Sequence, residues 1–347
     1  MNIQELLKQC IAQNASDLHL SSGLPPMLRI HGELVRISDA ALSHEDIRTA
    51  VMGIMNAPQR AHFDAQMECD FSFEIDGVSR FRTNVFMQTR GIGAAFRAIP
   101  NRMPTLESLG SPKIFSNFLN KPRGLVLVTG PTGSGKSTTL AAMVNAINHS
   151  KALHILTIED PVEFVHQPDK CLVNQREVGS QTQSFANALR SAMREDPDVI
   201  LVGEMRDLET IRLAITAAET GHLVFGTLHT SGAAKTIDRI IDVFPAEEKE
   251  MVRAMLSESL EAVISQVLCK RKDSKGRVGA YEIMVGSPAI RNLIREGKVA
   301  QMYSAMQTGS NAGMQTLDQA LQQLVSQGLI DVTEARSKAK YPEAFGG

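Results

Sequence analysis

The chain has 347 residues and 43% hydrophobic content, which is enough apolar material for packed cores and excludes a disordered chain. Lys and Arg number 36 against 38 Asp and Glu, so the formal charge of −2 argues against a protein whose main task is to neutralise a long phosphate backbone. Apolar runs are too short for a membrane-spanning helix, and the four cysteines form no CxxC pair, so reduced thiols in the cytoplasm are expected.

The first hundred residues, 1–100, are predicted to form an α+β domain. The start has no basic segment followed by an apolar run, so an exported protein is not expected. A helical stripe occupies 3–14, and Ser43 with Asp46 is spaced as a capping pair before a second helix. Asp76-Gly77 is a hairpin signal. Short apolar runs predict strands near 18–20, 28–30, 34–37, 71–75, 78–86 and 92–99.

A proline- and glycine-rich stretch, 101–122, predicts a linker to a second domain over 123–285. There, apolar runs alternate with helical stripes, which predicts an α/β domain with a parallel sheet covered on both faces. The predicted strands are 125–128, 153–158, 199–202 and 223–227. Helical patterns are also predicted at 237–244, at 251–263 and throughout the tail 286–347, with a hairpin around the charged turn 270–277.

The sequence GPTGSGKS lies directly between the first of these strands and a helix, and it matches GxxxxGKS. Glycines let backbone amides approach phosphate oxygens, while the helix start offers its positive dipole end. Lys136 is expected to reach the β- and γ-phosphates, and the Ser137 hydroxyl to ligate Mg²⁺. The alternative is a structural turn without a ligand. The predicted nucleotide-binding residues are Gly130, Pro131, Thr132, Gly133, Ser134, Gly135, Lys136, Ser137 and Thr138.

Polar residues follow the carboxyl ends of the other predicted strands. Three acids follow 153–158, namely Glu159, Asp160 and Glu163. Glu204 follows 199–202, and His229 follows 223–227. Ligands of open α/β sheets bind at this edge, where carboxylates can hold a metal ion or polarise a water for attack on the γ-phosphate. The alternatives are a solvated loop acid for Glu204, a capping or turn role for Asp160 and Glu163, and a satisfied polar residue at a strand end for His229. His222 lies at the other end of its strand, where a structural histidine is the alternative.

Arginines gather on the predicted hairpin of the first domain. Strand periodicity places Arg80, Arg82 and Asn84 on one face, and Arg97 lies in the next strand. Such side chains are often simply solvated. They could also swing onto a nucleotide in the same chain or across a subunit boundary, and an arginine finger is worth about 10³–10⁵ in rate.

Four motifs together resemble those of the secretion ATPase superfamily. They are GPTGSGKST at 130–138, TIEDPVEF at 157–164, VILVGEMRD at 199–207 and TGHLVFGTLHT at 220–230, and they resemble its Walker A, aspartate, Walker B and histidine boxes. SDLHL at 16–20, the spacing of Arg82 and Arg97, and AIRNLIREGK at 289–298 extend the resemblance over nearly the whole chain. The chain is most similar to the retraction ATPases of type IV pili. It shows neither the longer N-terminal region nor the tetracysteine insertion of the assembly and type II secretion ATPases.

The resemblance implies a PAS-like domain before a RecA-like P-loop NTPase core and a C-terminal helical tail. It implies Glu163 as general base, Glu204 in Mg²⁺ and water organisation, and Arg82 and Arg97 as nucleotide-facing arginines. His222 and His229 would be the histidine-box pair. The implied cofactors are ATP and Mg²⁺. The implied assembly is a homohexamer that docks on the pilus platform protein at the cytoplasmic face of the inner membrane, and a paralogous retraction ATPase is a further partner to consider.

Three alternatives to pilus retraction are a pilus assembly or type II secretion ATPase, a nucleic-acid-translocating motor and a regulatory subunit without turnover. The slight negative charge, the absence of tryptophan and the three tyrosines argue against the nucleic-acid motor, because few stacking platforms are available. No nucleic-acid partner is therefore expected. The presence of both Glu163 and Glu204 argues against a subunit that binds ATP without hydrolysing it.

Overall fold

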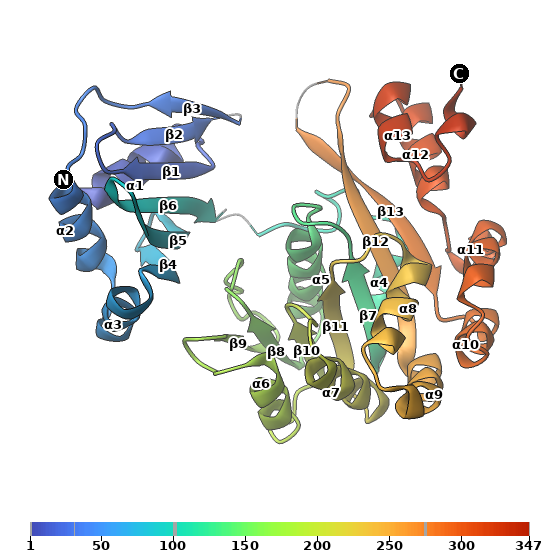
Figure 1. The fold of residues 1–347 in the computed structure, drawn as a ribbon. Helices are drawn as coiled ribbons and strands as arrows, with labels where there is room; N and C mark the ends of the chain where they lie inside the picture. The colour runs from blue at the N-terminus through green and yellow to red at the C-terminus, as the bar shows by residue number, and fades with distance from the viewer. Residues whose placement is uncertain (1, 31, 100–102, 274–275, 347) are drawn as a thin grey trace. The chain divides into compact units, whose positions relative to one another are not determined.

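The computed structural model describes residues 2–30, 32–99, 103–273 and 276–346. The chain divides into two compact units, Met1–Arg102 and Met103–Gly347. Each unit contains one sheet with its own hydrophobic core (Figure 1). Within the described residues, none of the helices is both long enough and apolar enough to cross a membrane.

Unit 1 is an antiparallel sheet with the strand order β3-β2-β1-β6-β5-β4 and three helices. Its elements are α1 (Ile3–Ala12), β1 (Asp17–Ser21), β2 (Met27–Ile30), β3 (Glu33–Arg36), α2 (His44–Ile54), α3 (Ala57–Gln66), β4 (Glu68–Ile75), β5 (Ser79–Gln88) and β6 (Gly91–Ile99). The predicted capping pair is confirmed, since Ser43 and Asp46 bond reciprocally at the start of α2. α1 and α2 pack their apolar faces on one face of the sheet, which leaves the other face polar.

Unit 2 contains a seven-stranded sheet with the order β13-β12-β7-β11-β10-β8-β9. Its strands are β7 (Gly124–Thr129), β8 (His154–Glu159), β9 (Leu172–Glu177), β10 (Val199–Val202), β11 (Leu223–Leu228), β12 (Leu260–Lys270) and β13 (Arg277–Val285). All neighbours are parallel except β12 and β13, which form an antiparallel pair. The carboxyl ends of β7, β11, β10 and β8 therefore lie at one edge, as the sequence predicts.

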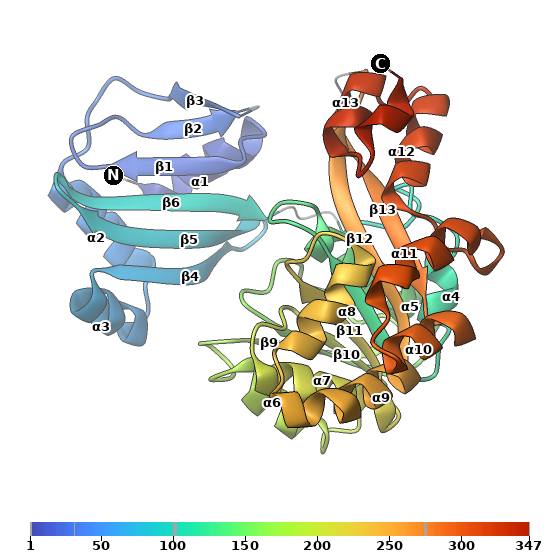
Figure 2. The same cartoon turned by 45° about the vertical axis from the view of Figure 1, so that its right-hand side comes forward.

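Helices cover both faces of this sheet, which confirms the predicted α/β class (Figures 1 and 2). One core cluster joins the sheet to α4 and α5, a second joins it to α6–α11, and a third packs α12 and α13 on β12 and β13. The helices are α4 (Phe115–Leu119), α5 (Lys136–Ser150), α6 (Phe185–Ala192), α7 (Leu208–Glu219), α8 (Ala233–Asp242), α9 (Lys249–Ser259), α10 (Pro288–Arg295), α11 (Val299–Thr308), α12 (Leu317–Ser326) and α13 (Val332–Lys338). The short 3₁₀ segments are Ala246–Glu248, Ser310–Ala312 and Pro342–Phe345.

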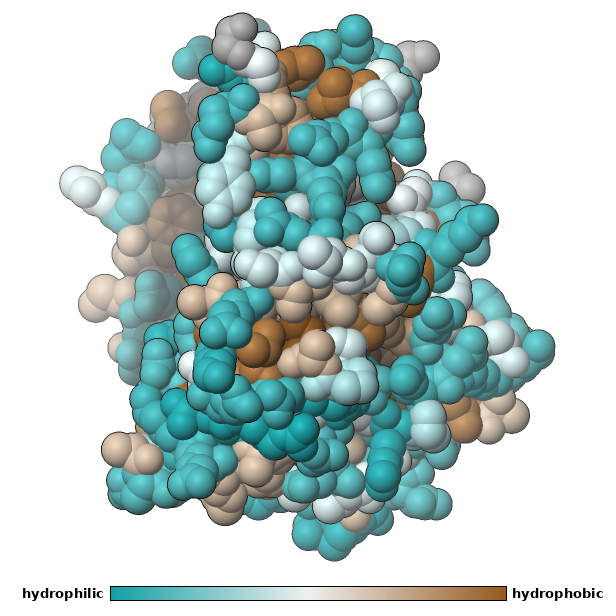
Figure 3. All heavy atoms as spheres, turned by 90° about the vertical axis from the view of Figure 1, so that its right-hand side faces the viewer, coloured by the Kyte–Doolittle hydropathy of each residue, from teal (hydrophilic) through white to brown (hydrophobic). Residues whose placement is uncertain are grey.

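The surface over the C-terminal helices is mainly hydrophilic, with apolar residues gathered near its middle (Figure 3).

All four cysteines, Cys10, Cys69, Cys171 and Cys269, are buried and unpaired. Burial raises the pKa of Cys10 and of Cys269 to about 11. These thiols behave as small apolar side chains of the core.

Two expectations about unit 2 are wrong. The segment expected as a linker, 101–122, is packed against unit 2 from residue 103 onward, because Leu106, Phe115 and Phe118 are buried in one core cluster with Val126 of β7. Its first two residues lie outside the described part. The helix expected through 251–263 ends at Ser259, since the residues that follow pair with β7 as strand β12.

Candidate nucleotide site

A glycine-rich loop at the carboxyl end of β7 is the centre of the site. It starts at Gly130 and leads into α5 at Lys136. Gly130 has φ 144°, and a Cβ there would lie 2.3 Å from the carbonyl oxygen of Gln266, so a larger residue does not fit. α5 begins without a side-chain cap. Its first N–H groups and its positive dipole end are therefore available to an anion.

Lys136 and Ser134 give the loop its polar interior. The Lys136 side chain is buried and its Nζ donates to the carbonyl oxygens of Gly130 at 3.0 Å and Pro131 at 3.1 Å. Burial lowers the pKa of Lys136, and the nearby carboxylates oppose part of that effect. The Ser134 hydroxyl is buried without a hydrogen-bond partner in the described part of the chain. A phosphate oxygen would satisfy it.

Gln266 of β12 supports the loop from behind, a contact that sequence reasoning missed. Its side chain is buried, and its Oε1 accepts a hydrogen bond from the Thr139 hydroxyl of α5 at 2.7 Å. A Cβ at Gly135 would lie 2.9 Å from its Nε2. The available signal was a polar Ser-Gln pair inside the apolar run 260–269. Gln266 therefore fixes both the loop and the first turns of the helix that follows it.

Glu204, Arg206 and His229 meet at the carboxyl ends of β10 and β11. His229 Nε2 lies 3.1 Å from Glu204 Oε1. Arg206 Nη2 donates to Glu204 Oε2 at 2.6 Å, and Arg206 Nε lies 2.5 Å from Oε1. Burial raises the pKa of Glu204, but the Arg206 hydrogen bonds and charge, together with His229, outweigh burial and lower it. Glu204 is thus an ionised carboxylate at neutral pH.

The local backbone fixes where Glu204 stands. Gly203 N donates to the carbonyl oxygen of Ile158 at 2.7 Å, and a Cβ on Gly203 would lie 3.0 Å from that oxygen. The Thr227 hydroxyl donates to the carbonyl oxygen of Gly203 from β11. This close approach explains why a glycine separates the strand from its acid.

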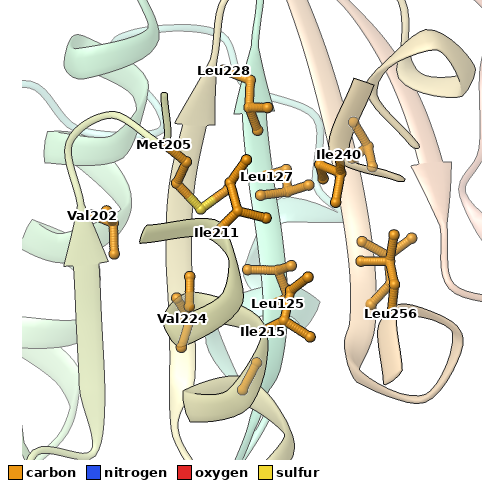
Figure 4. Packing of buried hydrophobic residues seen from close by; sticks show 14 of the residues in the cluster. Leu125, Leu127, Val202, Met205, Ile211, Ile215, Val224, Leu228, Ile240 and Leu256 are labelled. Atoms are coloured by element: carbon orange, nitrogen blue, oxygen red, sulfur yellow. The ribbon is translucent and has the colours of Figure 1, made fainter. Parts of the chain in front are cut away.

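Met205, directly after Glu204, anchors the segment in the core. Its side chain is 3% exposed and lies beside Ile211 of α7 (Figure 4). A Cβ on Gly226 of β11 would lie 3.0 Å from the Met205 sulfur. Met205 is therefore a core residue that also sets the path of the chain at the site.

Glu163 lies in the segment that follows β8. It is half-buried between two buried residues, Val162 and Phe164, and its charge acts on Lys136. Val162 N donates to Glu177 Oε2 at 3.0 Å, and Glu177 is itself buried at the end of β9. Glu177 was missed because β9 carries no apolar run. It positions the Glu163 segment from the neighbouring strand.

Two other acids of this segment have different surroundings. Asp160 is exposed, and its charge raises the pKa of Arg206 after the larger effect of Glu204. Glu159 Oε1 accepts hydrogen bonds from the Thr157 hydroxyl at 2.6 Å and from Gln175 Nε2 at 3.1 Å. Burial raises the pKa of Glu159. Of the three acids, Glu163 is the one whose charge raises the pKa of Lys136.

His222 does not join this cluster within the chain. It precedes β11, and its Nδ1 lies 3.0 Å from the carbonyl oxygen of Ala217. β11 and β7 are parallel, with Leu223 opposite Gly124, so His222 lies at the edge where β7 begins. The six residues of β11 separate it from the loop by roughly 20 Å, at about 3.3 Å per residue.

Arg82 and Arg97 lie directly opposite each other on the polar face of the unit 1 sheet. Both side chains are exposed. Arg97 Nε donates to Asp17 Oδ1 at 2.9 Å, and Asp17 is buried in the neighbouring strand. Two like charges directly opposite in a sheet repel. The Asp17 carboxylate offsets that repulsion, and a further anion would be attracted to the pair.

The chemistry of the loop edge suits Mg²⁺ as well as phosphate. The Ser137 hydroxyl, in the first turn of α5, makes no hydrogen bond within the described residues, so it is free to act as a ligand. Mg²⁺ is usually held by one or two protein oxygens together with phosphates and water. In the part of the chain that the structure describes, no group of three or more His, Cys, Asp or Glu side chains that could hold a metal ion is found.

Comparisons with known proteins agree with this geometry. The model of the type II/IV secretion system protein family, T2SSE, matches residues 1–337. The chain is 65% identical over 345 residues to the type IV pilus retraction ATPase PilT of Pseudomonas aeruginosa, covering 99% of this chain and 100% of that protein. It is 58% identical over 344 residues to a twitching motility protein of Neisseria gonorrhoeae, covering 99% and 92%.

A solved structure of the pilus retraction motor PilT with bound ADP superposes with a TM-score of 0.92 at 48% identity, covering 99% of this chain and 98% of that one. Two findings therefore agree along nearly the whole chain, one from sequence and one from fold. The chain belongs to the type II/IV secretion system protein family.

Proposed function

We propose that this protein is an ATP-hydrolysing motor that powers retraction of type IV pili and thereby twitching motility. The observation that carries the proposal is the loop 130–137 beside the carboxylates Glu204 and Glu163 at one edge of a parallel sheet. Acidic groups placed around a bound phosphate chain suit phosphoryl transfer to water. The two curated relatives described above, a retraction ATPase and a twitching motility protein, support the biological role.

The proposed roles combine the contacts of the site with the roles that the family resemblance implies. When a nucleotide binds, Lys136 would exchange its two loop carbonyls for phosphate oxygens, and Ser137 would hold Mg²⁺, whose charge would offset that of the phosphates. Glu163 accepts a proton from the attacking water. Glu204 orients water and Mg²⁺ from the neighbouring strand end, with His229 on one of its oxygens.

The wider assembly is also a proposal. Arg82 and Arg97 of unit 1 approach the nucleotide as cations, either in the same chain or in a neighbouring chain. His222 would contact a nucleotide only at a different surface of the protein from the one that carries His229. We propose a homohexamer that acts with the pilus platform protein at the cytoplasmic face of the inner membrane, with a paralogous retraction ATPase as a further partner. Light scattering of the purified chain tests the hexamer, and cell fractionation tests the location.

Two substitutions test the active site. Lys136→Ala should abolish ATP binding, whereas Glu204→Gln should retain binding and lower turnover by about 10²–10³, the usual loss when a preorganised charge is removed. Lys170→Ala is the matched control, since Lys170 is an exposed lysine outside the site. Full turnover in both site variants would refute the assignment.

Deletion of the gene distinguishes retraction from assembly. Cells without a retraction motor should keep surface pili but lose twitching, and the Glu204→Gln variant should fail to restore movement. Cells without any surface pili would instead indicate a role in assembly.

A further inference from the structure

A row of buried polar side chains crosses three neighbouring strands of unit 2. Thr129 of β7 lies opposite Ser265 of β12, which lies opposite Glu282 of β13. All three side chains are buried. Thr129 directly precedes Gly130, so the row begins at the phosphate loop. Polar groups at these positions within apolar strands require partners, because burial of an unpaired polar group is costly.

The partners are at the start of α8. Gly232 N donates to the Ser265 hydroxyl at 2.9 Å, and Ala233 N donates to Glu282 Oε1 at 2.7 Å. α8 has no side-chain cap of its own. The residues that lead into α8 begin with His229, the residue that contacts Glu204. Ser265 and Glu282 therefore fix the far end of the short segment that carries His229.

The second oxygen of Glu282 contacts a different helix. Leu317 N, the first residue of α12, lies 3.4 Å from Glu282 Oε2. The same region is tied to β13 by reciprocal backbone hydrogen bonds between Gln315 and Ile283, at 2.8 and 3.1 Å. One carboxylate thus lies at the N-termini of two helices. α8 follows the segment at the nucleotide site, and α12 is the first of the last two helices of the chain.

The charge of Glu282 suits this position. Both helix N-termini carry partial positive charge, and each offers an N–H group without an intrahelical partner. No ion pair involves Glu282 within the described residues. Its carboxylate instead accepts hydrogen bonds from the backbone N–H groups of Ala233 and Leu317. A glutamine here would lose the charge and would turn an NH₂ group toward one N–H donor. A shift of either helix changes the position of the carboxylate that the other helix uses.

We propose that Glu282 is a positioning residue that couples the His229 segment to α12, so that the nucleotide edge and the C-terminal helices move together. The proposal depends on the proposed ATP site for its role in the motor. The coupling itself is a property of the fold and can be measured without nucleotide.

Hydrogen exchange by mass spectrometry on the full chain tests the coupling. Thr316→Ala removes the hydroxyl cap of α12, which accepts from Gln319 N at 3.3 Å. It should speed exchange at 229–236 by at least about twofold, the lower range for side chains that share a network. In a Glu282→Gln background the same change should have no effect on 229–236. Unaltered exchange there after Thr316→Ala, or an equal response in both backgrounds, would overturn the proposal.

Ser265→Ala tests the coupling from the α8 side. It releases α8 at Gly232, so exchange should rise near 232 and, through Glu282, also at 316–321; the rise at 316–321 should disappear in the Glu282→Gln background. Unaltered exchange at 316–321 after Ser265→Ala would overturn the proposal. Glu282→Gln should raise exchange at both places, by about fivefold for each lost hydrogen bond. If Glu282→Gln does not fold, the Thr316→Ala and Ser265→Ala results still decide. ATP binding and turnover of Lys136→Ala are measured separately, so failure of the ATP site and failure of the coupling are distinguished.

Discussion

Replacing Met205 with alanine tests whether core packing holds Glu204 in place. Met205 is 3% exposed and lies in the core between α7 and β11. Truncation of a buried methionine costs about 2–5 kcal/mol, because the surrounding side chains close the cavity only in part. For a unit as long as Met103–Gly347, each kcal/mol lowers the melting temperature by roughly 2–4 °C, so a loss of roughly 4–20 °C is expected.

Activity should fall further than stability alone explains. The residue directly before Met205 is Glu204, and a displacement of about 1 Å in a reacting group can cost about 10²-fold in rate. We expect ATP turnover to fall by about ten- to a hundredfold at a temperature well below the melting transition. The measurement combines thermal unfolding with initial rates at saturating ATP.

Met302→Ala provides the comparison. Met302 of α11 is fully buried in the same core cluster but adjoins none of the site residues in sequence. It should lose a similar amount of stability and keep nearly full turnover at low temperature. Equal turnover in the Met205 and Met302 variants would refute the reasoning that the core beneath Glu204 sets its position.

Three further predictions concern the loop, the carboxylate and the arginine. Gly130→Ala should abolish nucleotide binding by equilibrium dialysis while the chain stays folded, because the added Cβ would meet a backbone carbonyl at 2.3 Å; normal binding would contradict the loop geometry. Arg206→Gln should raise the pKa of Glu204, so the acidic limb of the rate–pH profile should move to higher pH; an unmoved limb would show that Arg206 does not set it. Asp17→Asn should lower turnover because Asp17 holds Arg97, and it should leave the melting temperature within a few degrees. If Arg97→Ala lowers turnover but Asp17→Asn does not, Asp17 does not act through Arg97.

Local patterns were sufficient for much of the fold. The parallel strands, the phosphate loop and the capped start of α2 each have a signal within ten or so residues, either a continuous apolar run or a motif with a direct physical cause. These runs did not predict the order of the strands in the sheet. They predicted only that the carboxyl ends of the parallel strands lie at one edge. That edge was enough to place Glu204, His229 and Glu163 near the loop.

Elements without a local signal were missed. β9 has only two apolar residues followed by four polar ones, and it is part of the sheet through its pairing with β8. α3 buries only Phe63 and has no apolar stripe, although Asn56 and Gln59 form a capping box. The helix predicted through residue 263 carried an apolar pattern that a strand beside β7 buries equally well. Periodicity does not distinguish these cases for short apolar runs.

Site residues that act through distant contacts were missed for a related reason. Gln266, Glu177 and Glu282 are separated along the chain from the groups they hold, and nothing in the neighbouring sequence indicates those partners. Their partners are backbone N–H groups or a hydroxyl, which carry no sequence signature. Only the folded chain shows that these side chains are the ones that position the site.

The burial of every native thiol has a practical consequence for following this motor at work. Because burial raises the pKa of Cys10 and Cys269 and removes all four sulfurs from solvent, little reactive thiolate is offered to a maleimide dye at neutral pH. A single cysteine introduced on an exposed helix would therefore take the fluorophore selectively in an otherwise unmodified sequence, and its emission would report movement during turnover.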